Sequence, residues 1–280
     1  MESAEARREL RRLLDESPEP FPFDRAALLL AADADPSLDV RPYEACLDRY
    51  AERVGEAAGA GEPDPRRRLG ALRRVVFEDE GFHGNRDDYY DVRNSYLNEV
   101  LDRKLGIPIS LATVVLGVAR RLGWPLHPVN FPQHFLLRYA TPDEPLAVDA
   151  FHGGLILGAD ELEERWRFAT GYDAPDASRM LEPAAPVGVL VRMLNNIRGI
   201  HHQQQDYRGA ARATELIGLI DPLNPQHERD LGYFLLKARE LEPGITHLER
   251  YLERAPHAVD ADVVREYLAS LRGPRRPPEA

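Results

Sequence analysis

The stretch that decides the fold is Gly106-Ile107-Pro108-Ile109-Ser110-Leu111, which opens an apolar helix predicted to run to about Leu122. Apolar residues recur along it at the spacing i, i+3, i+4, i+7, i+8 and i+11, at Leu111, Val114, Val115, Val118, Ala119 and Leu122. This spacing forms one continuous apolar face on a helix of 3.6 residues per turn, and such a face must be buried. Pro108 suits a first helical turn, and Gly123 followed by Pro125 ends the helix.

Ser110 lies in the first turn of this predicted helix. Backbone N–H groups are unpaired at that position and the helix dipole is positive, so a nucleophilic oxygen there would be assisted. Serine is also a favoured helix cap. The helix alone therefore leaves two roles open for Ser110, a nucleophile or a cap.

The overall composition limits the classes of function. A chain of 280 residues holds one large or two ordinary domains, and either is large enough to bury a sizeable core. The formal net charge of −11 opposes general attraction to nucleic acid phosphates or to an anionic membrane. We therefore expect neither a nucleic acid partner nor a membrane partner.

The N-terminus and the cysteine content indicate the compartment. Residues 1–12 alternate acids and arginines and lack the apolar region of a secretory signal, and no run of about 18 apolar residues occurs. The single cysteine, Cys46, forms no internal disulfide and no cysteine pair for a metal, which fits a reducing compartment. We expect a cytoplasmic protein.

Proline, glycine and charge clusters divide the chain into regions. Helical patterns at 10–14, 24–32, 43–58 and 66–77 predict an N-terminal helical region over residues 1–80. A core domain is expected over 81–175, followed by a linker around 174–186. Prolines recur near a 34-residue period, at Pro186, Pro222 and Pro256, which predicts a tetratricopeptide-like helical module over 186–272. Residues 273–280 are expected to be a disordered tail.

After Gly123 the apolar pattern changes to a period of two, which predicts strands. Residues 126–129 form the first, and Pro128 indicates that this strand lies at an edge. Residues 135–139 and 146–150 form a predicted hairpin, because the loop between them has turn composition. From Phe151 the chain is expected to return to loop and then helix, over residues 159–168.

A register for this hairpin follows from centring its loop between Thr141 and Pro142. Leu137 then pairs with Leu146, and His134 lies directly opposite Asp149. Cross-strand Cβ atoms in such a pair are about 4.5 to 5.5 Å apart, within reach of an imidazole–carboxylate hydrogen bond. A slip of one residue would place the two side chains on opposite faces.

Ser110, His134 and Asp149 together have the residue types of a catalytic triad. A serine hydroxyl is a weak nucleophile and needs a general base, for which His134 is the candidate. A carboxylate such as Asp149 fixes the imidazole tautomer and orientation.

Four sequence blocks in order, residues 94–101, 106–112, 129–138 and 148–154, resemble the SirB-type bacterial branch of the transglutaminase-like superfamily. The resemblance implies an α+β fold, with a papain-like core of helices packed on a small antiparallel sheet. An N-terminal helical region and a tetratricopeptide-like module at the C-terminal end also belong to the layout of that branch.

The resemblance assigns roles to individual residues. The superfamily triad is Cys-His-Asp, in which His134 and Asp149 match the histidine and the aspartate and Ser110 occupies the place of the cysteine. The amides of Asn94, Asn98 and Gln133 become candidate substrate or oxyanion contacts. Asn98 has packing inside a helix as its alternative role. Gln133 replaces a glycine that the branch would carry before the histidine.

Serine in the cysteine position excludes chemistry through a thioester, because the hydroxyl stays protonated until it attacks. Two functions remain. The first is a non-catalytic or divergent regulatory member that binds a protein partner through its C-terminal helical repeats. The alternative is a serine-dependent acyl transferase or amide or ester hydrolase that uses the triad.

Neither a cofactor nor a metal is expected from the sequence. His127, His152, His201 and His202 lack the His-x-x-x-His spacing of a helical zinc site, so we interpret them as ordinary surface or core residues.

Overall fold

The computed structural model describes residues 2–141 and 144–271, and the tail expected at 273–280 lies outside these residues. The contacts between residues divide the chain into two compact units, Met1–Met193 and Leu194–Ala280. Each unit is described by itself below.

The first unit begins with helices, as predicted: α1 (Ser3–Glu16), α2 (Phe23–Ala34), α3 (Arg41–Ala58) and α4 (Pro65–Arg73). Helix α4 continues directly into a π-helical segment, η1 (Arg74–Asp79). After a short 3-10 turn, η2 (Val92–Asn94), helix α5 spans Leu97–Arg103. The sequence block 94–101 therefore enters its helix only at Leu97.

The helix predicted to be central is α6 (Pro108–Arg121), with Pro108 in its first turn. Its residues from Pro108 to Ala119 are all buried, because α2, α3, α5 and strands of both sheets pack around it. Two ion pairs join the end of α6 to α2, from Arg120 and Arg121 to Asp24. The carboxylate of Asp24, itself buried, accepts a hydrogen bond from Arg121 at 2.6 Å.

The main sheet is antiparallel, in the order β3 (Leu126–Val129), β4 (Leu136–Tyr139), β5 (Leu146–Asp149) and β6 (Leu155–Leu157). The prediction that the strand with Pro128 lies at an edge is confirmed. The expectation of a loop directly after Phe151 missed β6, since three residues are too few to establish a period. A second, two-stranded sheet pairs β1 (His83–Gly84) with β2 (Leu105–Gly106) in parallel.

The predicted hairpin register is wrong by two residues. Leu137 pairs with Val148 instead of Leu146, and Tyr139 pairs with Leu146. The connection is therefore centred one residue later than assumed, between 142 and 143. Side chains alternate faces with a period of two, so this shift leaves every side chain on its predicted face. The predicted cross-strand pair of His134 with Asp149 is therefore wrong, because His134 lies in the turn before β4.

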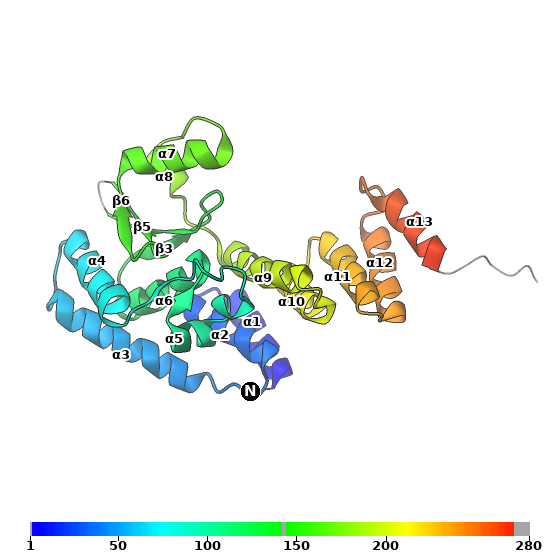
Figure 1. Cartoon of the computed structure of the whole chain (residues 1–280), viewed down its shortest axis with the longest axis horizontal. Helices are drawn as coiled ribbons and strands as arrows, with labels where there is room; N and C mark the ends of the chain where they lie inside the picture. The colour runs from blue at the N-terminus through cyan, green and yellow to red at the C-terminus, as the bar shows by residue number, and fades with distance from the viewer. Residues whose placement is uncertain (1, 142–143, 272–280) are drawn as a thin grey trace, which may run out of the picture. The chain divides into compact units, whose positions relative to one another are not determined.

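Helices cover both faces of the main sheet (Figure 1). Helix α6 packs on one face, and α7 (Ala159–Thr170) and α8 (Ala177–Met180) lie on the other. Their shared core contains apolar residues of strands and helices, namely Val129, Phe131, Leu136, Ala147, Leu157, Leu162, Met180 and Leu181. The segment 174–186, predicted to be a linker, thus contributes a short helix and two buried side chains to this core.

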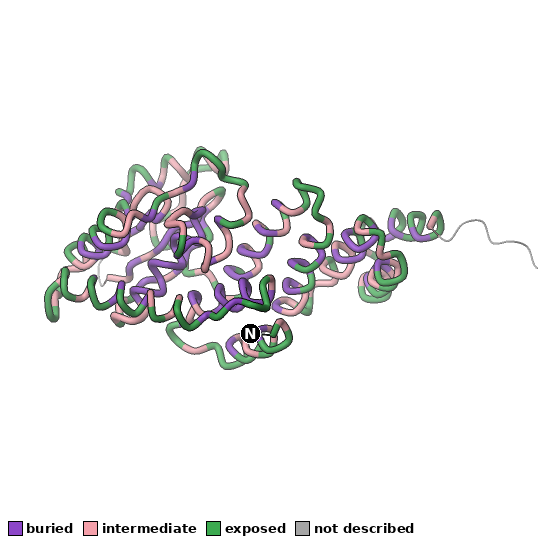
Figure 2. The backbone as a smooth tube through the Cα atoms, turned by 60° about the horizontal axis from the view of Figure 1, so that its bottom comes forward, coloured by how far each residue is buried: buried purple, intermediate pink, exposed green. Residues whose placement is uncertain are grey.

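The second unit is helical where it is described, as predicted for a tetratricopeptide-like module. Helix α9 (Pro186–Gln203) enters it, followed by α10 (Tyr207–Ile220), α11 (Gln226–Lys237), α12 (Leu241–Arg254) and α13 (Ala261–Leu271). Buried and exposed stretches alternate along these helices (Figure 2), as expected for amphipathic helices that pack on their neighbours.

Two glycines let α11 and α12 approach closely. A Cβ atom on Gly232 would lie 2.9 Å from the carbonyl oxygen of Gly244 and 2.8 Å from the Leu248 side chain. Because backbone atoms do not move aside easily, this contact requires glycine.

None of the helices formed by residues 2–141 and 144–271 combines the length and the apolar character needed to cross a membrane.

Candidate functional site

Ser110 lies at the start of α6, where it is only 3 % exposed. Its Oγ atom donates to the carbonyl oxygen of Asn94 at 2.6 Å and accepts from the N–H of Ile107 at 3.0 Å. The second bond gives an acceptor to the backbone N–H group of the residue before the helix, as the N3 side chain of a capping box does. Among the described residues, the hydrogen bonds of Ser110 all go to backbone atoms, and none goes to His134.

Asn94 is fully buried and supports the same helix start. Its Nδ2 atom donates to the carbonyl oxygen of Asp88 at 2.7 Å, and its Oδ1 accepts from Asn85 at 3.1 Å. Both ends of the amide are thus used within the protein. This arrangement fixes the carbonyl group that receives the Ser110 hydroxyl.

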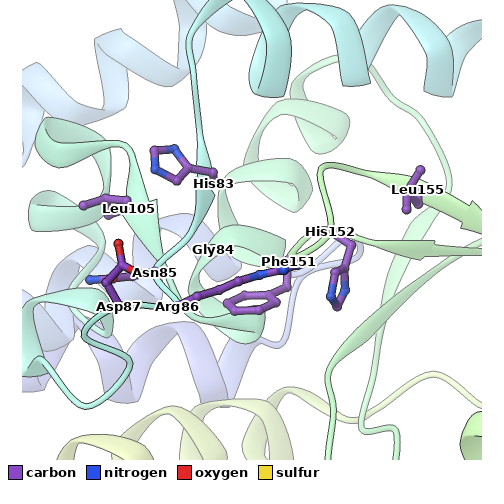
Figure 3. A pocket seen from close by; sticks show the side chains of 9 residues that line it. All are labelled: His83, Gly84, Asn85, Arg86, Asp87, Leu105, Phe151, His152 and Leu155. Atoms are coloured by element: carbon purple, nitrogen blue, oxygen red, sulfur yellow. The ribbon is translucent and has the colours of Figure 1, made fainter.

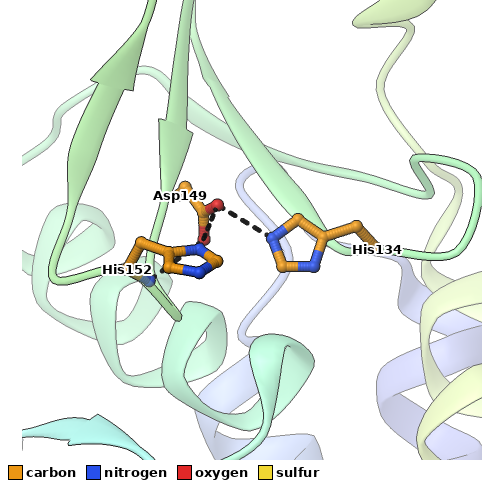
Figure 4. A group of neighbouring side chains, drawn as sticks. All are labelled: His134, Asp149 and His152. Atoms are coloured by element: carbon orange, nitrogen blue, oxygen red, sulfur yellow. Dashed lines mark hydrogen bonds and ion pairs between the residues drawn. The ribbon is translucent and has the colours of Figure 1, made fainter. Parts of the chain in front are cut away.

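His134 and Asp149 meet, although the predicted register was wrong. The Nε2 atom of His134 is 2.9 Å from Oδ2 of Asp149. The two side chains approach from the turn before β4 and from the end of β5, as Figure 4 shows. Asp149 is fully buried, whereas the His134 side chain keeps 17 % of its surface exposed.

Two further side chains bind the same carboxylate oxygen, and the sequence analysis missed both. His152 approaches with Nδ1 at 2.8 Å, and Arg165 of α7 donates from Nη1 at 2.8 Å. The other oxygen, Oδ1, accepts the N–H groups of Phe151 and His152. A signal for His152 was present in its position three residues after a strand-ending aspartate, where such a turn brings the side chain back. Arg165 comes from a separate helix and left no comparable signal.

The electrostatics of this cluster favour an ionised Asp149. Burial by itself would raise the pKa of the carboxyl group. The hydrogen bonds and charges of His134 and His152 act in the opposite direction and prevail, so that the pKa of Asp149 lies well below its usual range. Arg165 is held by Asp149 and by Glu161, and these two partners raise its pKa against the effect of its own burial.

An aromatic and cationic wall adjoins His134. The ring of Phe151 packs edge to face against His134 and against Tyr89. Arg192 donates to the carbonyl oxygen of His134 at 2.6 Å and lies over the ring of Phe135. Burial lowers the pKa of this guanidinium group, and the nearby Tyr89 partly opposes that effect.

A cleft of about 640 Å³ opens beside this cluster (Figure 3). Residues from three parts of the first unit line it, namely His83, Gly84, Asn85, Arg86, Asp87, Leu105, Phe151, His152 and Leu155. The ring of Phe151 packs on the backbone of Gly84 so closely that a Cβ atom on residue 84 would lie 2.4 Å from the ring. His152 is thus the member of the Asp149 cluster that also lines the cleft.

The other two predicted contact residues occupy different places. The Oδ1 atom of Asn98 on α5 is buried and has no hydrogen bond within the described part of the chain. Gln133 adopts a positive φ of 54°, a conformation that favours glycine, and its amide donates to the carbonyl oxygen of Ala169 on α7 at 2.9 Å. Gln133 therefore directs its side chain to the C-terminal end of α7.

Comparisons with known proteins agree with this architecture. The profile of the transglutaminase-like superfamily matches residues 41–195, and that of the tetratricopeptide repeat matches residues 197–269. The chain therefore belongs to the transglutaminase-like superfamily, and a relative that is 38 % identical over 260 residues places it in the family of proteins named UPF0162.

The relatives that share this name cover most of the chain. A UPF0162 protein from Xylella fastidiosa is 38 % identical over 260 residues, which are 92 % of both chains. Another from Vibrio cholerae is 26 % identical over 223 residues, 78 % of this chain and 81 % of the relative. The human protein F-box only protein 21 is 48 % identical over 103 residues, 34 % of this chain and 17 % of the relative.

Proposed function

We propose that this chain is a transglutaminase-like protein that acts by binding a protein partner and not by acyl transfer through Ser110. The observation that carries the proposal is the hydrogen bond from Ser110 Oγ to the Asn94 carbonyl oxygen at 2.6 Å. A hydroxyl group has one proton, and here that proton points to a backbone acceptor and not to an imidazole.

Attack by Ser110 would require this arrangement to be undone. The hydroxyl would have to leave the Asn94 carbonyl, and the buried N–H of Ile107 would lose its acceptor. A buried donor without a partner costs about 1 to 3 kcal/mol. Ser110 is also nearly inaccessible, which supports a role in fixing the start of α6.

The partner would bind through the helical repeats of the second unit. Repeats of the tetratricopeptide type generally mediate protein interactions, and their match covers residues 197–269. As finer points of the same proposal, we assign the chain to the SirB-type branch and to the cytoplasm. The four sequence blocks and the single cysteine support these assignments.

A fluorophosphonate probe tests the claim about Ser110, because such probes label activated serines. We expect no labelling of the folded wild-type protein, and none of the matched variant Ser110→Ala. Labelling in proportion to the protein, lost in both Ser110→Ala and His134→Asn, would overturn the proposal.

Cross-linking of the full chain in a cell extract tests the claim about the partner. We expect the cross-linked peptides of this chain to come mainly from residues 197–269. Cross-links confined to residues 1–193 would contradict a partner on the repeats.

One observation favours the alternative, a serine-dependent hydrolase or acyl transferase. His134 contacts Asp149 through Nε2, which leaves Nδ1 of the same ring available for a proton. The labelling experiment separates the two functions, because only the alternative requires an activated Ser110.

A further inference from the structure

We propose that His134, Asp149 and His152 form a binding site for a divalent transition metal ion of the Zn²⁺ class. This inference goes beyond the proposed function and does not depend on Ser110. The two histidines come from a turn before β4 and from the turn after β5, and they meet at one buried carboxylate (Figure 4).

The ligand atoms already converge. His134 Nε2 and His152 Nδ1 lie 2.9 and 2.8 Å from the same oxygen, Asp149 Oδ2, and one ligand atom from each residue lies within 4.8 Å of the others. Neighbouring ligand atoms in a tetrahedral zinc site are about 3.3 Å apart, given metal–ligand distances near 2.0 to 2.1 Å. One ion could therefore replace the two shared protons once the two imidazole nitrogens, which lie within 4.8 Å of each other, approach to about 3.3 Å.

The carboxylate is already oriented. Asp149 Oδ1 accepts the N–H groups of Phe151 at 3.0 Å and of His152 at 3.2 Å, so the group cannot rotate freely. Such supporting hydrogen bonds fix metal ligands and raise the affinity of a site. The other carboxylate oxygen, Oδ2, faces the two imidazoles and is the atom that would bind the metal.

The donor set selects the class of ion. Two imidazole nitrogens and one carboxylate oxygen suit Zn²⁺, Co²⁺ or Ni²⁺, whereas Mg²⁺ and Ca²⁺ prefer sites made of oxygen. Three protein ligands leave a fourth position for water or another small ligand. His152 also lines the cleft of about 640 Å³, so this ligand is in contact with open space (Figure 3).

Arg165 opposes the metal. Its Nη1 atom lies 2.8 Å from Asp149 Oδ2, and a guanidinium charge repels a second cation at that oxygen. Its Nη2 atom donates to Glu161 at 2.9 Å, so Arg165 keeps a partner on its own helix when the metal binds. The affinity is thus set by competition with Arg165 and with the protons of the two histidines.

Titration of the full chain with Zn²⁺ against a chromophoric chelator tests the site, after removal of metal by dialysis with a chelator. We expect one ion per wild-type chain and at least a tenfold loss of affinity in His152→Gln. His152 is one-third exposed, so this variant should fold. The matched control is His247→Gln, which removes a histidine bonded to Glu228 in the second unit and should leave the affinity unchanged.

Three further measurements keep the proposal falsifiable. Asp149→Asn retains the shape of the ligand and should also weaken binding, and Co²⁺ in the wild type should give visible absorption bands that His152→Gln lacks. Arg165→Gln should bind Zn²⁺ several times more tightly than the wild type.

The following results would overturn the site. One is that the folded wild type binds no Zn²⁺ at micromolar concentration. Another is that His152→Gln binds Zn²⁺ as tightly as the wild type, and a third is that Arg165→Gln binds it no more tightly than the wild type. None of these results bears on the labelling of Ser110, so the site and the proposed function can fail separately.

Discussion

The Ser110 end and the Asp149 end of the candidate site are built by different kinds of contact. Ser110 bonds only to backbone groups among the described residues, and these bonds form the start of α6. Asp149 binds two imidazoles and a guanidinium group, all of which are polar side chains that can exchange partners. Ser110 is therefore part of the scaffold, whereas the groups around Asp149 remain able to bind a ligand or to move protons.

The largest expected loss of folding stability comes from Asp149→Ala. It leaves Arg165 and two backbone N–H groups without their acceptor in a buried place. Breaking one side of a buried ion pair costs about 3 to 5 kcal/mol, and we expect about 3 kcal/mol because Arg165 is partly exposed. Urea denaturation, with the midpoint and slope fitted together, measures the loss.

Asp149→Asn is the matched control for this loss. Its amide oxygen still accepts the N–H groups of Phe151 and His152, so we expect a smaller destabilisation than in Asp149→Ala. Equal stability of the two variants would show that charge, and not these backbone bonds, explains the whole effect. A loss below about 1 kcal/mol in Asp149→Ala would contradict the buried cluster.

A smaller effect is expected at the other end. Ser110→Ala removes the acceptor of Ile107 N–H and the donor to Asn94, and we expect a loss of about 1 to 3 kcal/mol in the same assay. The control is Thr113→Val, which removes another buried hydroxyl from α6. Thr113 only donates to the carbonyl oxygen of Ile109 one turn earlier, so its loss should stay below about 1 kcal/mol.

The structural role assigned to Ser110 fails if Ser110→Ala and Thr113→Val have the same stability. That result would mean that the bonds of Ser110 are no more important than an ordinary bond within a helix. Ser110 would then be free to serve as something other than part of the helix start.

The smallest expected effect is a pH dependence of the stability contributed by Asp149, which Ser110 does not share. The pKa of Asp149 is lowered in the folded state, so its contribution to stability is present above about pH 3.9, the unfolded value, and is lost as the pH falls further. The difference in stability between wild type and Asp149→Asn should therefore shrink by roughly 0.5 to 1 kcal/mol from pH 6 to pH 3.5.

The difference between wild type and Ser110→Ala serves as the reference for this measurement. Ser110 does not titrate, so that difference should be the same at both pH values in urea denaturation. A pH-independent difference for Asp149→Asn would show that the carboxylate has no lowered pKa.

Much of this architecture could be predicted from local patterns. The apolar spacing from Leu111 onward predicted α6, and the alternation after Gly123 predicted three of the four strands of the main sheet. The hairpin register was wrong by two residues, yet His134 and Asp149 still meet. Their contact does not depend on the register, because the turn before β4 places His134 beside the end of β5.

Contacts between distant elements could not be predicted in the same way. His152 was interpreted as an ordinary histidine and Arg165 as part of an amphipathic helix, because neither pattern indicates which carboxylate lies nearby. Asn94 was a candidate substrate contact, but in the structure its amide is used by Asp88 and Asn85. Asn98 and Gln133 remain predictions as substrate contacts.

The sequence by itself determined most of the longer helices and three strands of the main sheet, since hydrophobic period, proline and glycine act over a few residues. It also determined that a serine lies in the first turn of the central helix, that a histidine precedes one strand and that an aspartate ends the next. Only the tertiary structure decided what these groups bind. The proton of Ser110 goes to a carbonyl group 16 residues away, and Asp149 collects a second histidine and an arginine. Hydrogen bonds are satisfied by whichever partners the packed chain brings within about 3 Å, and that proximity is a property of the fold.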